Sequence, residues 1–312
     1  MEDGKSEDVP PGRAFTCGII MGGADAIPGV SASTMALILG IYSNFIESLY
    51  QIVNWFKIKF NLKKLTERNS NSIKSSLKVL IPIAFGMLIG IFLISRLLIG
   101  PDENPGIMRK TETGAIAYSF VFGLVLSSAS TPIQRIEKTT KKHWILGVIS
   151  ALLLASFTMI GVNEAEPPLW TLPLAGAIAA TAMLIPGISG SLVLLILGHY
   201  AIISSALNDF EFVKLFIFSI GLLIGAIISI PIIHRILATH HDSLMAILSG
   251  LILGSLPTLW PWKNQYNIES GKVQNIAPTN QFMGVTVAFI IGFTIIILLQ
   301  QLEKKRKQNH SV

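Results

Sequence analysis

The chain has 312 residues, of which 51% are hydrophobic and only 13% are charged, a composition that excludes an ordinary soluble domain and indicates several membrane-spanning helices. Its net charge of +6 does not indicate nucleic-acid binding, because the Lys and Arg residues gather between the apolar stretches, as they do in the loops that orient a membrane protein. The single cysteine, Cys17, excludes an internal disulfide and a site built from several cysteines.

The first apolar segment, which follows a hydrophilic N-terminus at 1–13, is interrupted. It covers residues 14–42, and Pro-Gly followed by Ser-x-Ser separates a limb at 14–27 from a limb at 33–42. A helix of the longer limb would measure about 21 Å, which is less than the ~30 Å hydrocarbon core of a bilayer. The segment is therefore either a re-entrant hairpin, which leaves the membrane on the face that it entered, or one long kinked helix.

The rest of the first half is predicted to be helical. Between residues 44 and 60, apolar side chains recur at helical spacing before a Lys-rich stretch, a pattern typical of an amphipathic helix at the membrane interface. Three stretches long and apolar enough to span a bilayer follow, at 79–100, 115–131 and 144–161.

The second half repeats the first. Residues 182–200 match residues 24–42 at a constant offset of 158, with 11 of 19 positions identical, so the chain is a duplicated unit. The second half again contains an interrupted segment, at 172–200, and then three spans and a basic tail, at 214–233, 243–261, 281–302 and 303–312.

Glycines four residues apart also occur at matching places in the two halves. They are Gly86 and Gly90 in the first half, and Gly221 and Gly225 in the second. Small residues at this spacing allow helices to approach closely in lipid, so we expect packing to be their main role.

The distribution of charge favours hairpins over kinked spans, since Lys and Arg concentrate in cytoplasmic loops. With two hairpins, most of the 24 Lys and Arg, including those of the N-terminus and the tail, lie on the cytoplasmic side. Full crossings at both interrupted segments would divide them more evenly and put the basic tail outside.

Each half then has an odd number of spans, so the second copy must lie upside down relative to the first. The predicted fold is an all-α polytopic membrane protein of two inverted repeats, each a re-entrant helical hairpin plus three transmembrane helices. We expect it in the cell (inner or plasma) membrane, with both termini cytoplasmic.

The interrupted motif suits the binding of an anion. Proline lacks a backbone donor and glycine adopts unusual dihedral angles, so each Pro-Gly ends one half-helix. The next half-helix begins at the serines, with unpaired N–H groups and the positive end of its dipole. Hydroxyl donors lie at the same place, which predicts a cradle for a phosphate or carboxylate, formed by Pro28, Gly29, Ser31, Ser33, Thr34, Pro186, Gly187, Ser189, Gly190 and Ser191.

The alternative for these serines is that they only cap their own helices, as Ser and Thr commonly do. Two copies that meet within a membrane favour the functional interpretation, because irregular backbone at that depth is tolerated only where protein buries it or where it lines a cavity.

Two charged residues lie within apolar stretches and are further candidates for the site. Asp25 ends the first limb, where its counterpart is Met183. It either titrates during transport coupled to protons or another ion, or accepts hydrogen bonds from the next half-helix. Arg96, near the outer end of the first span, either reaches a bound phosphate or extends to the outer headgroups.

Both motifs resemble the paired signatures of the polyprenyl-phosphate transporters, also called undecaprenyl phosphate translocases. The residues that carry the resemblance are Gly-Ala-Asp-Ala-Ile-Pro-Gly-Val-Ser-Ala-Ser-Thr at 23–34, Leu-Gly-Ile-Tyr at 39–42 and Ile-Pro-Gly-Ile-Ser-Gly-Ser at 185–191. The resemblance covers nearly the whole chain, although Ser31-Ala-Ser-Thr34 stands where that family usually has Ser-Gly-Gly-Thr. It implies the return of undecaprenyl phosphate, the recycled lipid carrier of cell-wall assembly, from the outer to the cytoplasmic leaflet.

Two other functions use similar chemistry. A polyprenyl pyrophosphate phosphatase has inverted hairpins with Pro-Gly-x-Ser-Arg-Ser, but Ala32 and Gly190 stand where its arginine would be, and phosphoryl cleavage without a cationic clamp is hard to explain. An ion-coupled carrier of a small organic anion would use the same helix dipoles, and the sequence alone does little to distinguish it from a polyprenyl-phosphate transporter.

We therefore predict a flippase for undecaprenyl phosphate or a related polyprenyl phosphate that works by alternating access. The sequence indicates no catalytic residue, metal site, cofactor or nucleic-acid partner, and it does not define the oligomeric state.

Overall fold

The computed structural model describes residues 9–27, 30–60, 67–98, 100, 104–159, 167–266 and 273–310. Within these ranges every regular element is a helix, apart from a single bridge between Lys263 and Asn275, so the predicted all-α class is confirmed. In chain order the helices are α1 (Pro11–Asp25), α2 (Ala32–Ile38), α3 (Tyr42–Phe60), α4 (Glu67–Leu98), α5 (Gly114–Ser128), α6 (Ser130–Ile133), α7 (Lys141–Met159), η1 (Leu169–Thr171), α8 (Leu172–Leu184), α9 (Gly190–Ile196), α10 (Tyr200–Asn208), α11 (Phe212–Thr239), α12 (His241–Gly254), η2 (Leu256–Leu259) and α13 (Phe282–His310).

Five helical stretches in the described residues are long and apolar enough to cross a membrane. They correspond to five of the six predicted spans. The remaining prediction, 144–161, falls on α7, whose described part is not among the five, and residues 160 and 161 lie outside the described residues. The five are Ser72–Leu98, Gly114–Ile133, Phe212–Thr239, His241–Leu259 and Phe282–Leu302.

The outward faces of the long helices are apolar. On α4, Phe85, Leu88 and Phe92 are 63%, 66% and 63% exposed, and their spacing puts them on one face of the helix. Exposed large apolar side chains also run along α11 and α13. A continuous apolar surface of this kind marks contact with lipid, so the chain is a membrane protein.

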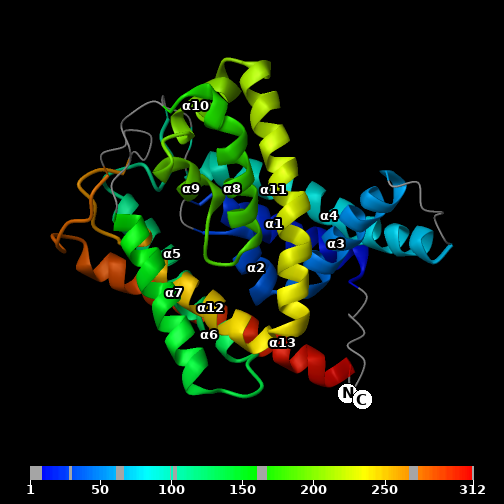
Figure 1. Cartoon of the computed structure of the whole chain (residues 1–312). Coiled ribbons are helices and arrows are strands. Elements are labelled where there is room, and N and C mark those ends of the chain that lie inside the picture. The colour runs from blue at the N-terminus through cyan, green and yellow to red at the C-terminus, as the bar shows by residue number, and fades with distance from the viewer. Residues whose placement is uncertain are drawn as a thin grey trace.

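Four pairs of helices make up most of the packing: α1 with α4, α8 with α11, α5 with α13, and α7 with α12 (Figure 1). The helices of a pair run parallel, since Gly18 faces Ile83 and, one turn later, Gly22 faces Met87. In each of the other three pairs, the contacts also advance along both helices in the same direction. They are Gly221 with Pro173 and Gly225 with Ala177 for α8 and α11, Gly284 with Ile116 and Gly123 with Phe289 for α5 and α13, and Gly147 with Ala246 and Gly254 with Ala151 for α7 and α12.

These pairs relate the two halves of the chain. In the first two pairs, the interrupted segment of a half packs on the first span of the same half. In the other two, the second span of each half packs on the third long helix of the other half. The halves are therefore interleaved. The main buried cluster draws residues from both halves, and a smaller one lies on α8 and α9.

The predicted role of the matching glycines in packing is confirmed. A Cβ atom at Gly90 would lie 2.1 Å from the carbonyl oxygen of Ile19, and one at Gly225 would lie 2.3 Å from that of Ala177. Any side chain at either position would separate the helices.

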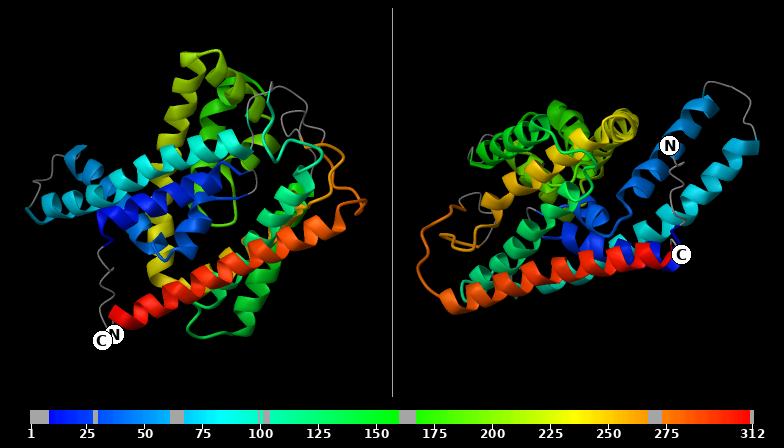
Figure 2. Two further views of the ribbon diagram at one scale, coloured as in Figure 1. Left: turned by 180° about the vertical axis from the view of Figure 1, so that it is seen from behind. Right: turned by 90° about the horizontal axis from the view of Figure 1, so that it is seen from below.

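Helices α4 and α13 run between two opposite sides of the molecule (Figure 2). The start of α4 and the end of α13 lie at one end, and the segment between α12 and α13 lies at the other (Figure 2). Elsewhere, Glu47 of α3 contacts His234 of α11, and the Gln281 side chain, just before α13, donates to the carbonyl oxygen of Glu112.

Candidate functional site

The first bend separates α1 from α2. Ser31 precedes α2 in an extended conformation, with φ of −117° and ψ of 137°, and its hydroxyl lies 2.6 Å from that of Ser33. Both side chains are buried. Two predicted members of the site at this bend, Pro28 and Gly29, lie outside the described residues.

The second bend repeats this arrangement between α8 and α9. Ser189 is again extended before its helix, with φ of −94° and ψ of 133°, and its hydroxyl lies 2.7 Å from that of Ser191. Gly187 has φ of +94°, which a residue with a side chain adopts only with strain. Pro186, Gly187 and Gly190 are all buried.

The serine hydroxyls do not cap their helices. Neither Ser31 nor Ser189 makes a side-chain capping hydrogen bond, although each stands at the N-cap position where serine usually does so. In both copies the hydroxyls bond within their own Ser-x-Ser pair instead. The capping explanation is therefore wrong for the geometry observed here.

The two bends contact each other directly. The backbone N–H of Gly187 donates a hydrogen bond of 2.9 Å to Oγ1 of Thr34, in a buried environment. A second hydrogen bond joins the same two parts of the chain: the Tyr42 hydroxyl, eight residues after Thr34, donates to the carbonyl oxygen of Leu184 over 3.1 Å. The structure thus brings the predicted residues Thr34 and Gly187 into contact across the two bends, and it pairs Ser31 with Ser33 and Ser189 with Ser191 within each bend.

At the far ends of the limbs, polar contacts tie the start of each interrupted segment to its finish. Arg13 donates to the carbonyl oxygen of Leu39 over 3.0 Å. In the second copy, the Thr171 hydroxyl lies 2.7 Å from Nε2 of His199, whose Nδ1 lies 2.9 Å from the carbonyl oxygen of Leu197. Each pair of limbs therefore folds back on itself.

The sequence predictions did not include these closing contacts. Positions 13 and 171 are separated by the repeat offset of 158, as are 39 and 197. That shared offset is the sequence signal from which a contact at these positions in both copies could have been predicted, although the residue types differ between the copies.

Asp25 and Arg96 have different surroundings. Asp25 is the last residue of α1, and its Oδ1 accepts a hydrogen bond of 3.4 Å from the N–H of Ala32. This is the predicted link to the next half-helix. Arg96 lies on the exposed face of α4, with its guanidinium 5.9 Å from the centre of the Phe92 ring. The structure thus places Arg96 among lipid-facing residues and not with the serines.

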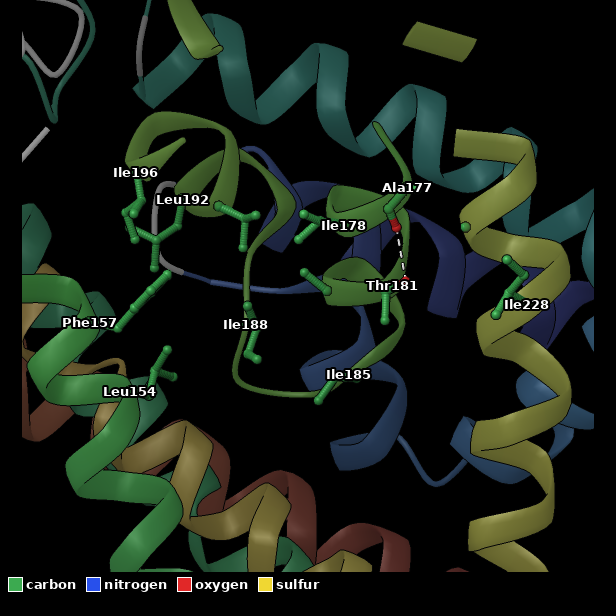
Figure 3. A pocket seen from close by; sticks show the side chains of 13 residues that line it. Leu154, Phe157, Ala177, Ile178, Thr181, Ile185, Ile188, Leu192, Ile196 and Ile228 are labelled. Atoms are coloured by element: carbon green, nitrogen blue, oxygen red, sulfur yellow. Dashed lines mark hydrogen bonds between the residues drawn. The ribbon is translucent and has the colours of Figure 1, made fainter. Parts of the chain in front are cut away.

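An apolar cavity of about 390 Å³ adjoins the second bend (Figure 3). Ile185 and Ile188, on either side of Pro186-Gly187, line it, and the side chain of Thr181 points toward it with its hydroxyl bonded to the carbonyl oxygen of Ala177. Among the described residues, no group of three or more His, Cys, Asp or Glu side chains could hold a metal ion.

Comparison with known proteins adds a second line of evidence. A family model described as undecaprenyl phosphate translocase-like matches residues 21–277, which include both bends. The chain is 30% identical over 307 residues to a polyprenyl-phosphate transporter of Vibrio cholerae serotype O1, covering 92% of this chain and 94% of that protein. It is 31% identical over 303 residues to a polyprenyl-phosphate transporter of Staphylococcus aureus, covering 90% and 93%. No solved structure matches the chain.

Proposed function

Because the chain belongs to the undecaprenyl phosphate translocase-like family, we propose that it moves undecaprenyl phosphate or a related polyprenyl phosphate from the outer to the cytoplasmic leaflet of the cell membrane. The observation that carries the proposal is the pairing of serine hydroxyls at both bends, buried for Ser31 with Ser33 and partly buried for Ser189 with Ser191. The cargo would be the lipid carrier recycled in cell-wall assembly.

The serine pairs supply donors that suit a phosphate. Within a pair, one hydroxyl proton is used between the two oxygens, and the other is available for a phosphate oxygen. Since α2 and α9 have only seven residues each, we assign more of the binding to hydroxyls than to helix dipoles. Neutral donors also hold the phosphate without a fixed positive charge, which favours release as well as binding.

We further propose that α1–α2 and α8–α9 are re-entrant hairpins related by inverted symmetry. The contacts of Arg13 with Leu39 and of Thr171 with His199 support this, because they bring the two ends of each segment together. The second span of the first half, α5, packs on the last helix of the second half, α13, and the second span of the second half, α12, packs on the last span of the first half, α7. A two-fold relation between the halves requires this exchange. Alternating access would then exchange which hairpin is open.

The proposed orientation has the N-terminus and the basic tail in the cytoplasm. In a Cys17→Ser background, we expect a membrane-impermeant maleimide to label Lys305→Cys only from the cytoplasmic side. Thr279→Cys, in the exposed segment before α13, should be labelled only from outside. The opposite pattern would rule out the hairpin topology.

The transport proposal is tested in sealed vesicles with a labelled polyprenyl phosphate added to one leaflet. We expect the purified protein to move the label between leaflets without releasing inorganic phosphate. Phosphate release would identify a phosphatase. Uptake of a small organic anion without lipid exchange would identify an anion carrier, and either result would overturn the proposal.

A further inference from the structure

The apolar cavity adjoins the second bend, which carries half of the proposed phosphate site. Ile185 and Ile188 line it, and Ile188 directly precedes Ser189, whose hydroxyl belongs to the second serine pair. Its other walls come from α7, α8, α9 and α11. Its volume of about 390 Å³ is within the range of ~300–1,000 Å³ that is typical of small-ligand sites.

The rim of the cavity opens sideways, toward the lipid-facing surface. Phe157 on α7, Ile178 on α8 and Ile228 on α11 all line it and are 43%, 40% and 58% exposed. An apolar molecule could therefore enter from the surrounding lipid without passing through water.

The corresponding positions that the structure describes in the first half are more buried. Ile27, Val30 and Ile38, which match the cavity residues Ile185, Ile188 and Ile196, are only 9%, 3% and 2% exposed. At Gly23, the counterpart of Thr181, a Cβ atom would lie 2.9 Å from the Ile94 side chain. At these described positions the two halves thus differ in exposure although their motifs match.

We propose, on the basis of the proposed function, that this cavity holds the isoprene units of the substrate that are nearest to its phosphate. A polyprenyl phosphate joins an anionic head directly to a branched hydrocarbon, and at the second bend the paired serines Ser189 and Ser191 are flanked in the sequence by the cavity residues Ile188 and Leu192. The cavity is too small for a whole polyprenyl chain, so the remainder stays in lipid through the open rim. Because lipid tails are as apolar as the cavity, its shape selects a branched chain over a straight one more than it adds affinity.

The test uses a polyprenyl phosphate that carries a diazirine in the isoprene unit next to the phosphate. It is irradiated with the wild-type protein in vesicles of phosphatidylethanolamine and phosphatidylglycerol, and the labelled residues are mapped by mass spectrometry. We expect labelling of cavity residues, and competition by unlabelled polyprenyl phosphate but not by diacyl phosphatidic acid.

Two variants and a control address the cavity itself. Thr181→Phe fills it from α8, and Ile228→Trp blocks its exposed rim on α11. Each should reduce labelling about tenfold, an effect of ~1.4 kcal/mol. Leu174→Phe, on the same helix as Thr181 but 59% exposed and not lining the cavity, should label as the wild type does.

The outcomes separate this inference from the transport proposal. If wild-type protein exchanges the lipid between leaflets but the diazirine labels other residues, or if both variants label normally, the cavity does not hold the isoprene units. Equal competition by phosphatidic acid would assign the cavity to ordinary acyl chains and also overturn the inference. If the wild type exchanges no lipid in the same vesicles, the transport proposal itself fails.

Discussion

The backbone N–H of Gly187 donates a hydrogen bond of 2.9 Å to Oγ1 of Thr34, a residue 153 positions earlier in the chain. This bond joins the two bends, and it is not reciprocated by symmetry, because the counterpart of Thr34 is Leu192, which has no hydroxyl and lines the apolar cavity. The same position therefore holds the bends together in one half and shapes the cavity in the other.

The first prediction concerns this bond. Thr34→Val keeps the shape of the side chain but leaves the buried N–H of Gly187 without its acceptor, which should cost about 1–3 kcal/mol of folding free energy. Unfolding by denaturant in detergent micelles measures the loss. Thr34→Ser retains the hydroxyl and serves as the control. Equal stability of the Val and Ser variants would show that the bond contributes little.

The second prediction concerns the serine pairs. The double variant Ser31→Ala and Ser189→Ala should reduce the rate of lipid exchange in vesicles while the protein still folds. The hydroxyls of Ser33 and Ser191 lose their partners, which should cost about 1–3 kcal/mol of folding free energy each. Ser128→Ala is a matched control, since Ser128 is equally buried and donates to the carbonyl oxygen of Val125 in its own helix. Wild-type exchange by the double variant would exclude these hydroxyls from the phosphate site.

The third prediction concerns the backbone of the second bend. Gly187→Ala forces a side chain into φ of +94°, a strain of about 1–3 kcal/mol. It also puts a Cβ atom 2.6 Å from the backbone nitrogen of Ile252 on α12. We expect lower stability and slower exchange together. Gly12→Ala, where nothing lies within 4 Å, should be neutral or slightly stabilising, since Ala favours helix.

The helices and bends followed from local patterns, because hydrophobic length and Pro-Gly interruptions act within a few residues of where they occur. The outward direction of the Arg96 side chain could not be predicted from such a pattern, because it depends on which face of α4 is covered by α1. Contact at Gly86 and Gly90 turns Phe85, Phe92 and Arg96 outward together, and helical spacing alone leaves that choice open.

The contact between the bends was anticipated, but its chemistry was not. Duplication predicts that matching segments meet, whereas the bond from Gly187 to Thr34 exists because the two copies differ at this position. A difference between copies has no periodic signature in a single sequence. The same reason applies to Ile27, Val30 and Ile38, which are more buried than their counterparts in the second half.

The fourth prediction concerns Asp25. An Asn side chain at this position keeps an oxygen that accepts a hydrogen bond from the N–H of Ala32, but it does not bind or release a proton as a carboxyl group does. If Asp25 takes part in ion coupling, Asp25→Asn should flatten the dependence of the exchange rate on pH while leaving the unfolding midpoint nearly unchanged. A pH profile identical to that of the wild type would leave Asp25 with the backbone role alone.

The last prediction concerns stability at alkaline pH. Lys263 lies between η2 and α13, outside the five apolar spans, and burial lowers the pKa of its ammonium group to about 8. Its Nζ donates to the carbonyl oxygen of Thr258 over 3.2 Å and to Oδ1 of Asn275 over 3.0 Å. In the unfolded chain a lysine has a pKa of about 10.4.

Between these two pKa values the unfolded chain binds more protons than the folded protein, so the free energy of unfolding rises with pH. The gain should reach about 1.6 kcal/mol from pH 8 to pH 9.5, a window that ends before most tyrosines of the unfolded chain ionise. Denaturant unfolding in detergent micelles at several pH values measures the slope. Lys263→Met is less stable at every pH, because Thr258 and Asn275 lose a donor, but it should show no such rise. A slope that persists in this variant would assign the effect to another group.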